Sequence, residues 1–249
     1  MIPKVIHYCW FGRNPLPESA VKCINSWKKY FPDYEIKEWN EDNFDVNSIP
    51  YTKEAYEAKK YAFVSDYARM WILYHFGGLY FDTYVEVIKP MDDIVTRGPF
   101  MGIEVEAAEG EVPQVAPGLG LGVTPSLGLY KDILDYYASL HFLGDDGSLN
   151  QITVVKHTTN VLVQNGLKQT NELQCVAGVW IYPREFFNPL DDNTGKLVIT
   201  ENTRSIHWYT KSWLKKRNPL LAWVVKRIHR CFGNDSLAWF RKLIDLMKR

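Results

Sequence analysis

Hydrophobic and polar positions near the start of the chain predict a strand, a helix and a second strand. Ile2–Trp10 has the pattern of a buried strand, a helix is predicted from about Glu18 to Tyr30, and Glu35–Trp39 alternates as a second strand. This order predicts a parallel sheet whose ligands bind beyond the carboxyl ends of its strands.

The pattern continues with a long helix and further strands. Lys53–Phe76 is predicted to be one helical stretch that ends at Gly77-Gly78, where helix C-termini favour glycine. Strands are predicted over Leu79–Ile88 and Phe100–Val105, and a helix over Leu127–His141. Residues 107–117 are expected to be irregular. The glycine-rich Gly118–Gly122 indicates backbone that approaches another group closely.

Composition and length favour one compact α/β domain with a terminal appendage among the 249 residues. The four cysteines, Cys9, Cys23, Cys175 and Cys231, show no spacing typical of zinc and are expected to be reduced thiols in a cytosolic protein. The chain begins with a predicted strand, and no run approaches the ~18 apolar residues that span a bilayer. We therefore expect neither export by a visible signal nor a membrane span.

Charge is distributed unevenly although the net charge is zero. Residues 211–249 carry 11 Lys or Arg against two acids, whereas residues 1–210 carry an excess of acids. Residues 214–249 are predicted to form a separate basic tail of two short amphipathic helices, a pattern typical of an interfacial membrane anchor. Packing of these helices on the acidic body, or on a second subunit, would explain the same pattern.

Two carboxylates lie two strand positions on either side of a tyrosine in the predicted strand Leu79–Ile88. Side chains alternate faces along a strand, so Asp82, Tyr84 and Glu86 are expected on one side. Carboxylates near a strand end suit a divalent cation held against a diphosphate, because Mg²⁺ and Mn²⁺ prefer hard oxygen ligands. A solvated edge strand would show the same spacing, so spacing alone leaves both interpretations open.

Four segments, in order along the chain, resemble glycosyltransferase family 32. They are Ile2–Gly12, Tyr61–Arg69, Phe76–Asp82, and Ser205–Tyr209 with Ser212-Trp213. That family contains bacterial capsule and lipopolysaccharide sugar transferases and yeast mannosyltransferases, and its donor site is similar to that of the clostridial glucosylating toxins. The resemblance implies a GT-A-like, Rossmann-related mixed sheet flanked by helices over residues 1–213.

The resemblance also implies a nucleotide-sugar site. His7 and Trp10 would bind the nucleotide, with the Trp10 indole stacked on the base. Asp66 would accept hydrogen bonds from sugar hydroxyls and Arg69 would reach the sugar or diphosphate, although an ordinary intrahelical ion pair has the same spacing. With Asp82, these two are the expected catalytic residues.

Three further residues complete the implied site. His207 would join Asp82 as a ligand of the metal, or would bind the diphosphate. Ser212 and Trp213 would belong to a loop that closes over the donor diphosphate and excludes water.

The sequence departs from the family's Asp-x-Asp motif at Tyr84, where a neutral phenol is a poor ligand for Mn²⁺ or Mg²⁺. Several outcomes stay open. A metal would bind weakly through Asp82, His207 and the diphosphate, or Glu86 would replace the missing carboxylate if the strand bends. Alternatively, Arg69 or Lys211 would offset the leaving-group charge without a metal. Loss of activity is the remaining alternative.

These expectations combine into one functional hypothesis. The chain is expected to transfer a hexose, with retention of anomeric configuration, from a nucleotide sugar to a lipid-linked saccharide acceptor in surface polysaccharide synthesis. UDP-galactose or UDP-glucose is the expected donor, with GDP-mannose as the alternative. Nucleic acid is not an expected partner, and the expected location is the cytoplasmic face of the membrane. A catalytically silent nucleotide-sugar or glycan-binding scaffold is the hypothesis of another class.

Overall fold

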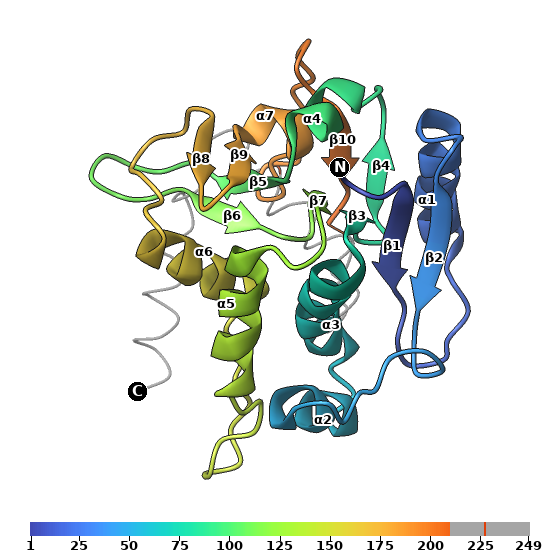
Figure 1. Cartoon of the computed structure of the whole chain (residues 1–249), viewed down its shortest axis with the longest axis vertical. Helices are drawn as coiled ribbons and strands as arrows, with labels where there is room; N and C mark the ends of the chain where they lie inside the picture. The colour runs from blue at the N-terminus through green and yellow to red at the C-terminus, as the bar shows by residue number, and fades with distance from the viewer. Residues whose placement is uncertain (210–226, 228–249) are drawn as a thin grey trace.

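The computed structural model describes residues 1–209 and residue 227, and Figure 1 shows its elements in chain order. The first half contains β1 (Val5–Cys9), α1 (Glu18–Tyr30), β2 (Glu35–Trp39), α2 (Pro50–Glu57), α3 (Tyr61–Phe76), β3 (Gly78–Tyr80), β4 (Val85–Val87), α4 (Asp92–Arg97) and β5 (Phe100–Val105). The second half contains β6 (Gln114–Ala116), β7 (Leu121–Val123), α5 (Gly128–Ala138), α6 (Val154–Gln164), β8 (Gln174–Val176), β9 (Val179–Tyr182), α7 (Arg184–Phe187) and β10 (Ser205–His207).

The main sheet has the strand order β2-β1-β3-β7-β5-β9-β8, with β6 paired to β5. β1 is parallel to β2 and β3, and β5 is parallel to β9. β7 lies between β3 and β5 and is antiparallel to both. β1, β3, β5 and β9 therefore point the same way, and their carboxyl ends lie along one edge of the sheet. The predicted parallel start is confirmed.

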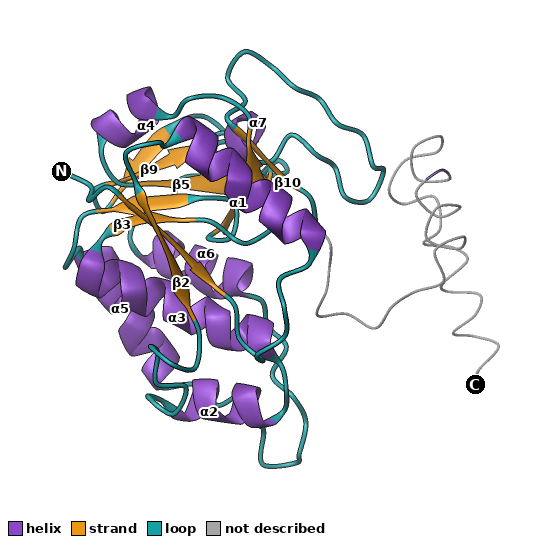
Figure 2. Cartoon of the chain, turned by 90° about the vertical axis from the view of Figure 1, so that its right-hand side faces the viewer, coloured by secondary structure: helices purple, strands orange, loops and turns teal. Residues whose placement is uncertain are grey.

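Helices cover both faces of this sheet. Figure 2 shows α2, α3, α5 and α6 on one side and α1, α4 and α7 on the other. Each side has its own hydrophobic cluster: Tyr51, Phe63 and Tyr137 belong to the first, and Trp27 and Phe187 to the second. The predicted architecture of a mixed sheet flanked by helices is confirmed.

Two of the predicted long elements are interrupted. The single helix predicted over Lys53–Phe76 was wrong: α2 ends at Glu57 and α3 begins at Tyr61, with Lys59 between them in the left-handed region at φ 57°. Leu79–Ile88 is not one strand either. A turn closed by the Val85 amide and the Asp82 carbonyl (2.9 Å) separates β3 from β4.

β4 leaves the main sheet and forms a two-stranded sheet with β10. The Trp27 indole on α1 donates a hydrogen bond to the Val85 carbonyl (2.7 Å), and the Ser26 hydroxyl accepts one from the Val87 amide (2.9 Å). These bonds fix β4 against α1, so the turn before it is held at the sheet edge. β10 brings a segment more than a hundred residues later in the chain beside that turn.

The basic tail predicted over residues 214–249 lies outside the described residues, apart from Arg227, so its boundary and its helices stay predictions. Among residues 1–209 and 227, no helix is both long and apolar enough to cross a membrane. Cys9, Cys23 and Cys175 are free thiols.

Candidate functional site

A cavity of about 930 Å³ opens at the sheet edge where β1, β3, β5 and β9 end. Trp10 follows β1, Asp82 follows β3, Glu104 lies near the end of β5 and Arg184 follows β9. All four line the cavity. Side chains from distant parts of the sequence therefore meet where a sheet of this kind favours ligand binding.

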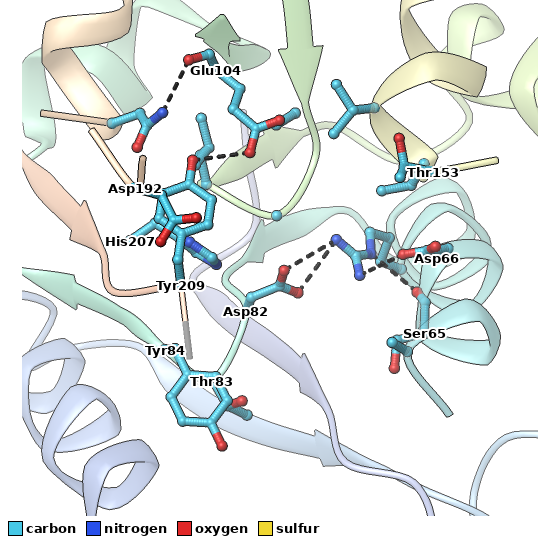
Figure 3. A pocket seen from close by; sticks show the side chains of 18 of the residues that line it. Ser65, Asp66, Asp82, Thr83, Tyr84, Glu104, Thr153, Asp192, His207 and Tyr209 are labelled. Carbon is cyan, nitrogen blue, oxygen red and sulfur yellow. Dashed lines mark hydrogen bonds and ion pairs between the residues drawn. The ribbon is translucent and has the colours of Figure 1, made fainter. Parts of the chain in front are cut away.

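Asp66, Arg69 and Asp82 form the centre of the cavity, and we call them the carboxylate–arginine cluster. The Arg69 guanidinium donates to Oδ1 of Asp66 at 3.0 Å and lies 3.3 Å from Oδ1 and 3.4 Å from Oδ2 of Asp82. Figure 3 shows Asp66 and Asp82 joined through this guanidinium. The three residues predicted to be catalytic thus lie together, and Arg69 is shared between two elements rather than confined to an intrahelical pair.

Burial distinguishes the two carboxylates of the cluster. The side chain of Asp66 is 10% exposed, whereas that of Asp82 is 29% exposed. Burial raises the pKa of Asp66 to about 7, since loss of solvation outweighs the attraction of Arg69, and the charge of Asp82 acts in the same direction. One guanidinium compensates two carboxylates, so Asp66 takes up a proton near neutral pH.

Two neighbours fix Asp82. The Tyr80 hydroxyl donates to its Oδ1 (3.2 Å), and the Gly118 backbone passes so close that a Cβ there would collide with Oδ2. The Asp82 amide also donates to the Gly118 carbonyl (3.3 Å). The glycine-rich segment therefore approaches another group closely, as its glycines predicted. That group is Asp82, which the sequence alone did not identify as the neighbour.

Trp10 lies at the end of the cavity next to β1. Its indole nitrogen donates to the Asn14 carbonyl (2.6 Å), and Gly12 in the same loop packs against the Tyr61 ring at the start of α3. Lys59 and Lys60 line this end as well. An aromatic face beside two lysines suits a nucleotide with its anionic diphosphate.

His7, which the resemblance assigned to nucleotide binding, is 2% exposed and does not line the cavity. Its Nδ1 accepts from the Trp39 indole (3.0 Å), and its Nε2 donates to the Gly77 carbonyl (3.0 Å). Burial lowers the pKa of His7 to about 4, so the ring is neutral at physiological pH. Both nitrogens are engaged within the protein, and His7 supports β1 rather than facing a ligand.

The residues expected to bind a metal are only partly assembled. Asp82 and His207 both line the cavity, but Asp82 is already engaged by Arg69 and Tyr80, and a phenol stands at position 84. Glu86 does not replace it, because its carboxylate accepts from the Trp208 indole (2.9 Å) and does not line the cavity. Within the described part of the chain, no three His, Cys, Asp or Glu side chains converge on a common point. These residues do not form a prebuilt site for Mn²⁺ or Mg²⁺.

His207 nevertheless faces the cavity in an unusual state. Its Nδ1 is buried without a hydrogen-bond partner among the described residues, and its ring packs on Tyr209 with centroids 4.2 Å apart. Burial lowers the pKa of His207, although Asp82 acts in the opposite direction. One ring nitrogen of His207 therefore has no hydrogen-bond partner in the part of the chain that the structure describes. Ser212 and Trp213 lie outside the described residues, so their roles stay predictions.

The side of the cavity beyond Asp82 contains polar residues that the sequence did not single out. Glu104 and Asn188 lie here with Tyr209, whose hydroxyl donates to Oε1 of Glu104 (2.9 Å). Asn188 donates through Nδ2 to the Glu104 carbonyl (3.0 Å). The sequence contained one indication of Glu104, since this carboxylate lies near the end of the predicted strand Phe100–Val105.

Comparison with known families gives a match that contains the cluster. Residues 17–101 match the family described as "Glycosyltransferase sugar-binding region containing DXD motif". Asp66, Arg69 and Asp82 all fall in this segment. The expected relationship to glycosyltransferases is confirmed for this region, whereas the narrower assignment to family 32 and to bacterial capsule synthesis stays a prediction.

Two curated relatives from Schizosaccharomyces pombe (strain 972 / ATCC 24843) are similar over part of their length. Inositol phosphoceramide mannosyltransferase 1 is 30% identical over 116 residues, which are 40% of this chain and 33% of the relative. Inositol phosphoceramide mannosyltransferase 3 is 32% identical over 98 residues, 38% of this chain and 27% of the relative. The chain thus spans about a third or less of these proteins.

Solved structures with similar folds include three glycosyltransferases. The PaToxG glycosyltransferase has a TM-score of 0.48 with 20% identity, covering 66% of this chain and 69% of that one. A glycosyltransferase involved in glycosylation of the major capsid of PBCV-1 has a TM-score of 0.49 with 13% identity, covering 84% and 95%. The galactosyltransferase LgtC has a TM-score of 0.43 with 14% identity, covering 90% and 93%.

Proposed function

We propose that this chain is a glycosyltransferase that moves a hexose from a nucleotide-diphosphate sugar to a hydroxyl of a saccharide acceptor. The observation that carries the proposal is the carboxylate–arginine cluster at the centre of a 930 Å³ cavity, within the segment that matches a glycosyltransferase sugar-binding region. The cluster offers acceptors for sugar hydroxyls beside a fixed positive charge. Trp10 offers a stacking face for the base on one side of it.

The three residues of the carboxylate–arginine cluster would have different roles, which follow from their positions. Asp82, the more exposed carboxylate, would accept hydrogen bonds from the sugar, and Asp66 would keep Arg69 oriented. Arg69 remains protonated throughout, so it would stabilise negative charge that develops on the leaving diphosphate. The cavity would hold donor and acceptor in contact while limiting the access of water.

The proposed transfer is a front-face displacement with retention of configuration. A bond forms between the acceptor oxygen and the anomeric carbon, and the bond from that carbon to the diphosphate oxygen breaks. The electron pair leaves with the nucleoside diphosphate, and the acceptor's proton passes to a diphosphate oxygen.

The donor and acceptor proposals rest on different support. We keep UDP-galactose or UDP-glucose as the expected donor, while the two mannosyltransferase relatives favour GDP-mannose as a second candidate. The names of these relatives also support a lipid-linked acceptor. A role in surface polysaccharide synthesis is proposed from the resemblance to bacterial sugar transferases, and a peripheral position at the cytoplasmic face of the membrane from the composition of the basic tail.

A donor panel tests the proposal directly. Purified full-length protein would be incubated with UDP-glucose, UDP-galactose and GDP-mannose, each with Mn²⁺ or with EDTA, while release of the nucleoside diphosphate is measured. We expect release from one donor, strongly reduced in Arg69→Ala and unchanged in Glu57→Gln, an exposed position on α2 outside the cavity. Tight donor binding without turnover under every condition would instead support the catalytically silent scaffold. That alternative stays open because Tyr84 replaces the second carboxylate of the Asp-x-Asp motif.

A further inference from the structure

The part of the cavity around Glu104 is negatively charged and is not used by the proposed donor. Glu104, Glu106, Asp191 and Asp192 line it, with Arg184 as the basic residue among them. In Figure 3, Glu104 and Asp192 lie with Tyr209 on the opposite side of Asp82 from Asp66 and Ser65. We propose that this side is the acceptor subsite, and that it takes a polyhydroxylated ring that carries no negative charge. This inference rests on the proposed transferase function.

Glu104 is the central residue of this subsite because its carboxylate is held in place. Tyr209 donates its hydroxyl to Oε1 (2.9 Å), while no described residue donates a hydrogen bond to Oε2. The Tyr209 ring is itself held by packing on His207, with ring centroids 4.2 Å apart. Glu104 thus presents one free acceptor oxygen in a fixed position, as recognition of a sugar hydroxyl requires.

Asn188 gives an independent indication of a ligand on this side. It is 2% exposed, its Nδ2 is used by the Glu104 carbonyl, and its Oδ1 has no partner in the part of the chain that the structure describes. Buried polar atoms are nearly always satisfied, so an unpartnered acceptor on a cavity wall calls for a donor from a ligand. A ring bearing several hydroxyl groups supplies such donors.

Charge separates this subsite from the nucleotide end. Trp10, Lys59 and Lys60 lie at the β1 end of the cavity. Glu104 lies on β5, which is three strands away from β1 in the order β1-β3-β7-β5. Three inter-strand spacings amount to roughly 14 Å. An anionic diphosphate is therefore attracted to one end of the cavity. A phosphate or carboxylate on the acceptor ring would be repelled at the other end, where Glu104, Glu106, Asp191 and Asp192 line the cavity.

Binding of simple glycosides to the protein in the presence of UDP or GDP would test this inference. The neutral probes are methyl α-mannoside, methyl α-galactoside and methyl β-glucoside, and the anionic probes are mannose 6-phosphate, methyl glucuronide and myo-inositol 1-phosphate. Saturation-transfer NMR would report binding, and the same glycosides would serve as acceptors in turnover assays. Donor hydrolysis without acceptor would be measured in parallel.

We expect the wild-type protein to prefer neutral probes by about tenfold or more, and Glu104→Gln to weaken their binding by about 10- to 100-fold, the range for a hydrogen bond to a charged group. Tyr209→Phe should weaken it less, and Glu57→Gln should not change it. Asp192→Asn should narrow the preference for neutral over anionic probes. Nucleotide affinity should stay at the wild-type level in Glu104→Gln, because the nucleotide is proposed to bind at the other end of the cavity.

Each opposite result has a distinct meaning. Equal use of anionic and neutral probes, or unchanged glycoside binding in Glu104→Gln, would overturn the acceptor assignment while leaving the transferase proposal intact. A loss of nucleotide binding in Glu104→Gln would place this residue on the donor instead. Failure of the wild-type protein to bind any nucleotide sugar would refute the proposed function itself.

Discussion

Replacing Gly118 with alanine should disable the site without unfolding the protein. A methyl group at this position would lie more than 1 Å inside the ordinary contact distance of 3.4 Å from Oδ2 of Asp82, and 3.3 Å from Nη1 of Arg69. The Asp82 carboxylate ends a short side chain that is able to rotate, so the fold accommodates the methyl by moving it. That movement breaks the contacts of Asp82 with Arg69 and Tyr80, which are already long at 3.2–3.4 Å.

The expected loss of activity follows from the size of this shift. A misplacement of about 1 Å in a positioning group costs about 10²-fold in rate, so kcat/KM for the donor should fall by that factor in Gly118→Ala. The thermal unfolding midpoint should change little. Gly128→Ala is the matched control, because this glycine begins α5 with no atom within 4 Å of its would-be Cβ. Equal activity of the two variants would refute the reasoning, and so would a large loss of stability confined to Gly118→Ala.

Three further predictions concern the charges of the cluster. Arg69→Ala leaves two carboxylates without their cation, so unfolding by urea should show a loss of about 3–5 kcal/mol; a loss below 1 kcal/mol would mean that the guanidinium does not compensate them. Tyr84→Asp restores a second carboxylate in the turn after Asp82, so the ratio of activity in Mn²⁺ to activity in EDTA should rise; an unchanged ratio would separate position 84 from any metal. Asp66 has a folded-state pKa of about 7, raised above its unfolded value, so its contribution to stability is lost as pH rises from about 4 to about 7. Asp66→Asn should therefore gain stability relative to the wild type over this interval in unfolding measurements, and a parallel pH dependence of the two proteins would contradict the raised pKa.

Local patterns predicted most of the regular elements of the first half. The bounds expected for the helix Glu18–Tyr30 and the strands Glu35–Trp39 and Phe100–Val105 are those of α1, β2 and β5. These elements have strong periodicity and clear turn residues at their ends, so local preference and tertiary packing agree.

The two errors have different physical causes. Lys59 adopts φ 57° although nothing in its identity favours that conformation, because the amide of Lys60 donates to the Ala55 carbonyl (2.8 Å) and closes the end of α2. The turn at Asp82–Val85 is followed by a strand that is bound by Trp27 and Ser26, some sixty residues earlier. These long-range contacts leave no trace in the alternation of the segment itself.

The residues of the candidate site that belong to a sequence motif were predictable. Those that only tertiary contacts bring together were not. Asp66, Arg69, Asp82 and Trp10 were expected from the resemblance, and all four line the cavity. Glu104, Asn188 and Tyr209 were missed, because their association joins β5, α7 and the segment after β10. His7 shows the converse error: a conspicuous histidine within a resembling segment supports a strand.

Charge balance links the tyrosine at position 84 to the state of Asp66. A second carboxylate at position 84 would add negative charge beside Asp82 that a divalent cation would have to offset. With tyrosine there, the centre of the cavity contains two carboxylates and one guanidinium, close to neutral once Asp66 binds a proton. An arriving diphosphate brings further negative charge, which favours the protonated form of Asp66 and frees part of the Arg69 attraction for the ligand. In the proposed function, the shared arginine and a proton on Asp66 would therefore compensate charge at the sugar, and Tyr84 would add none.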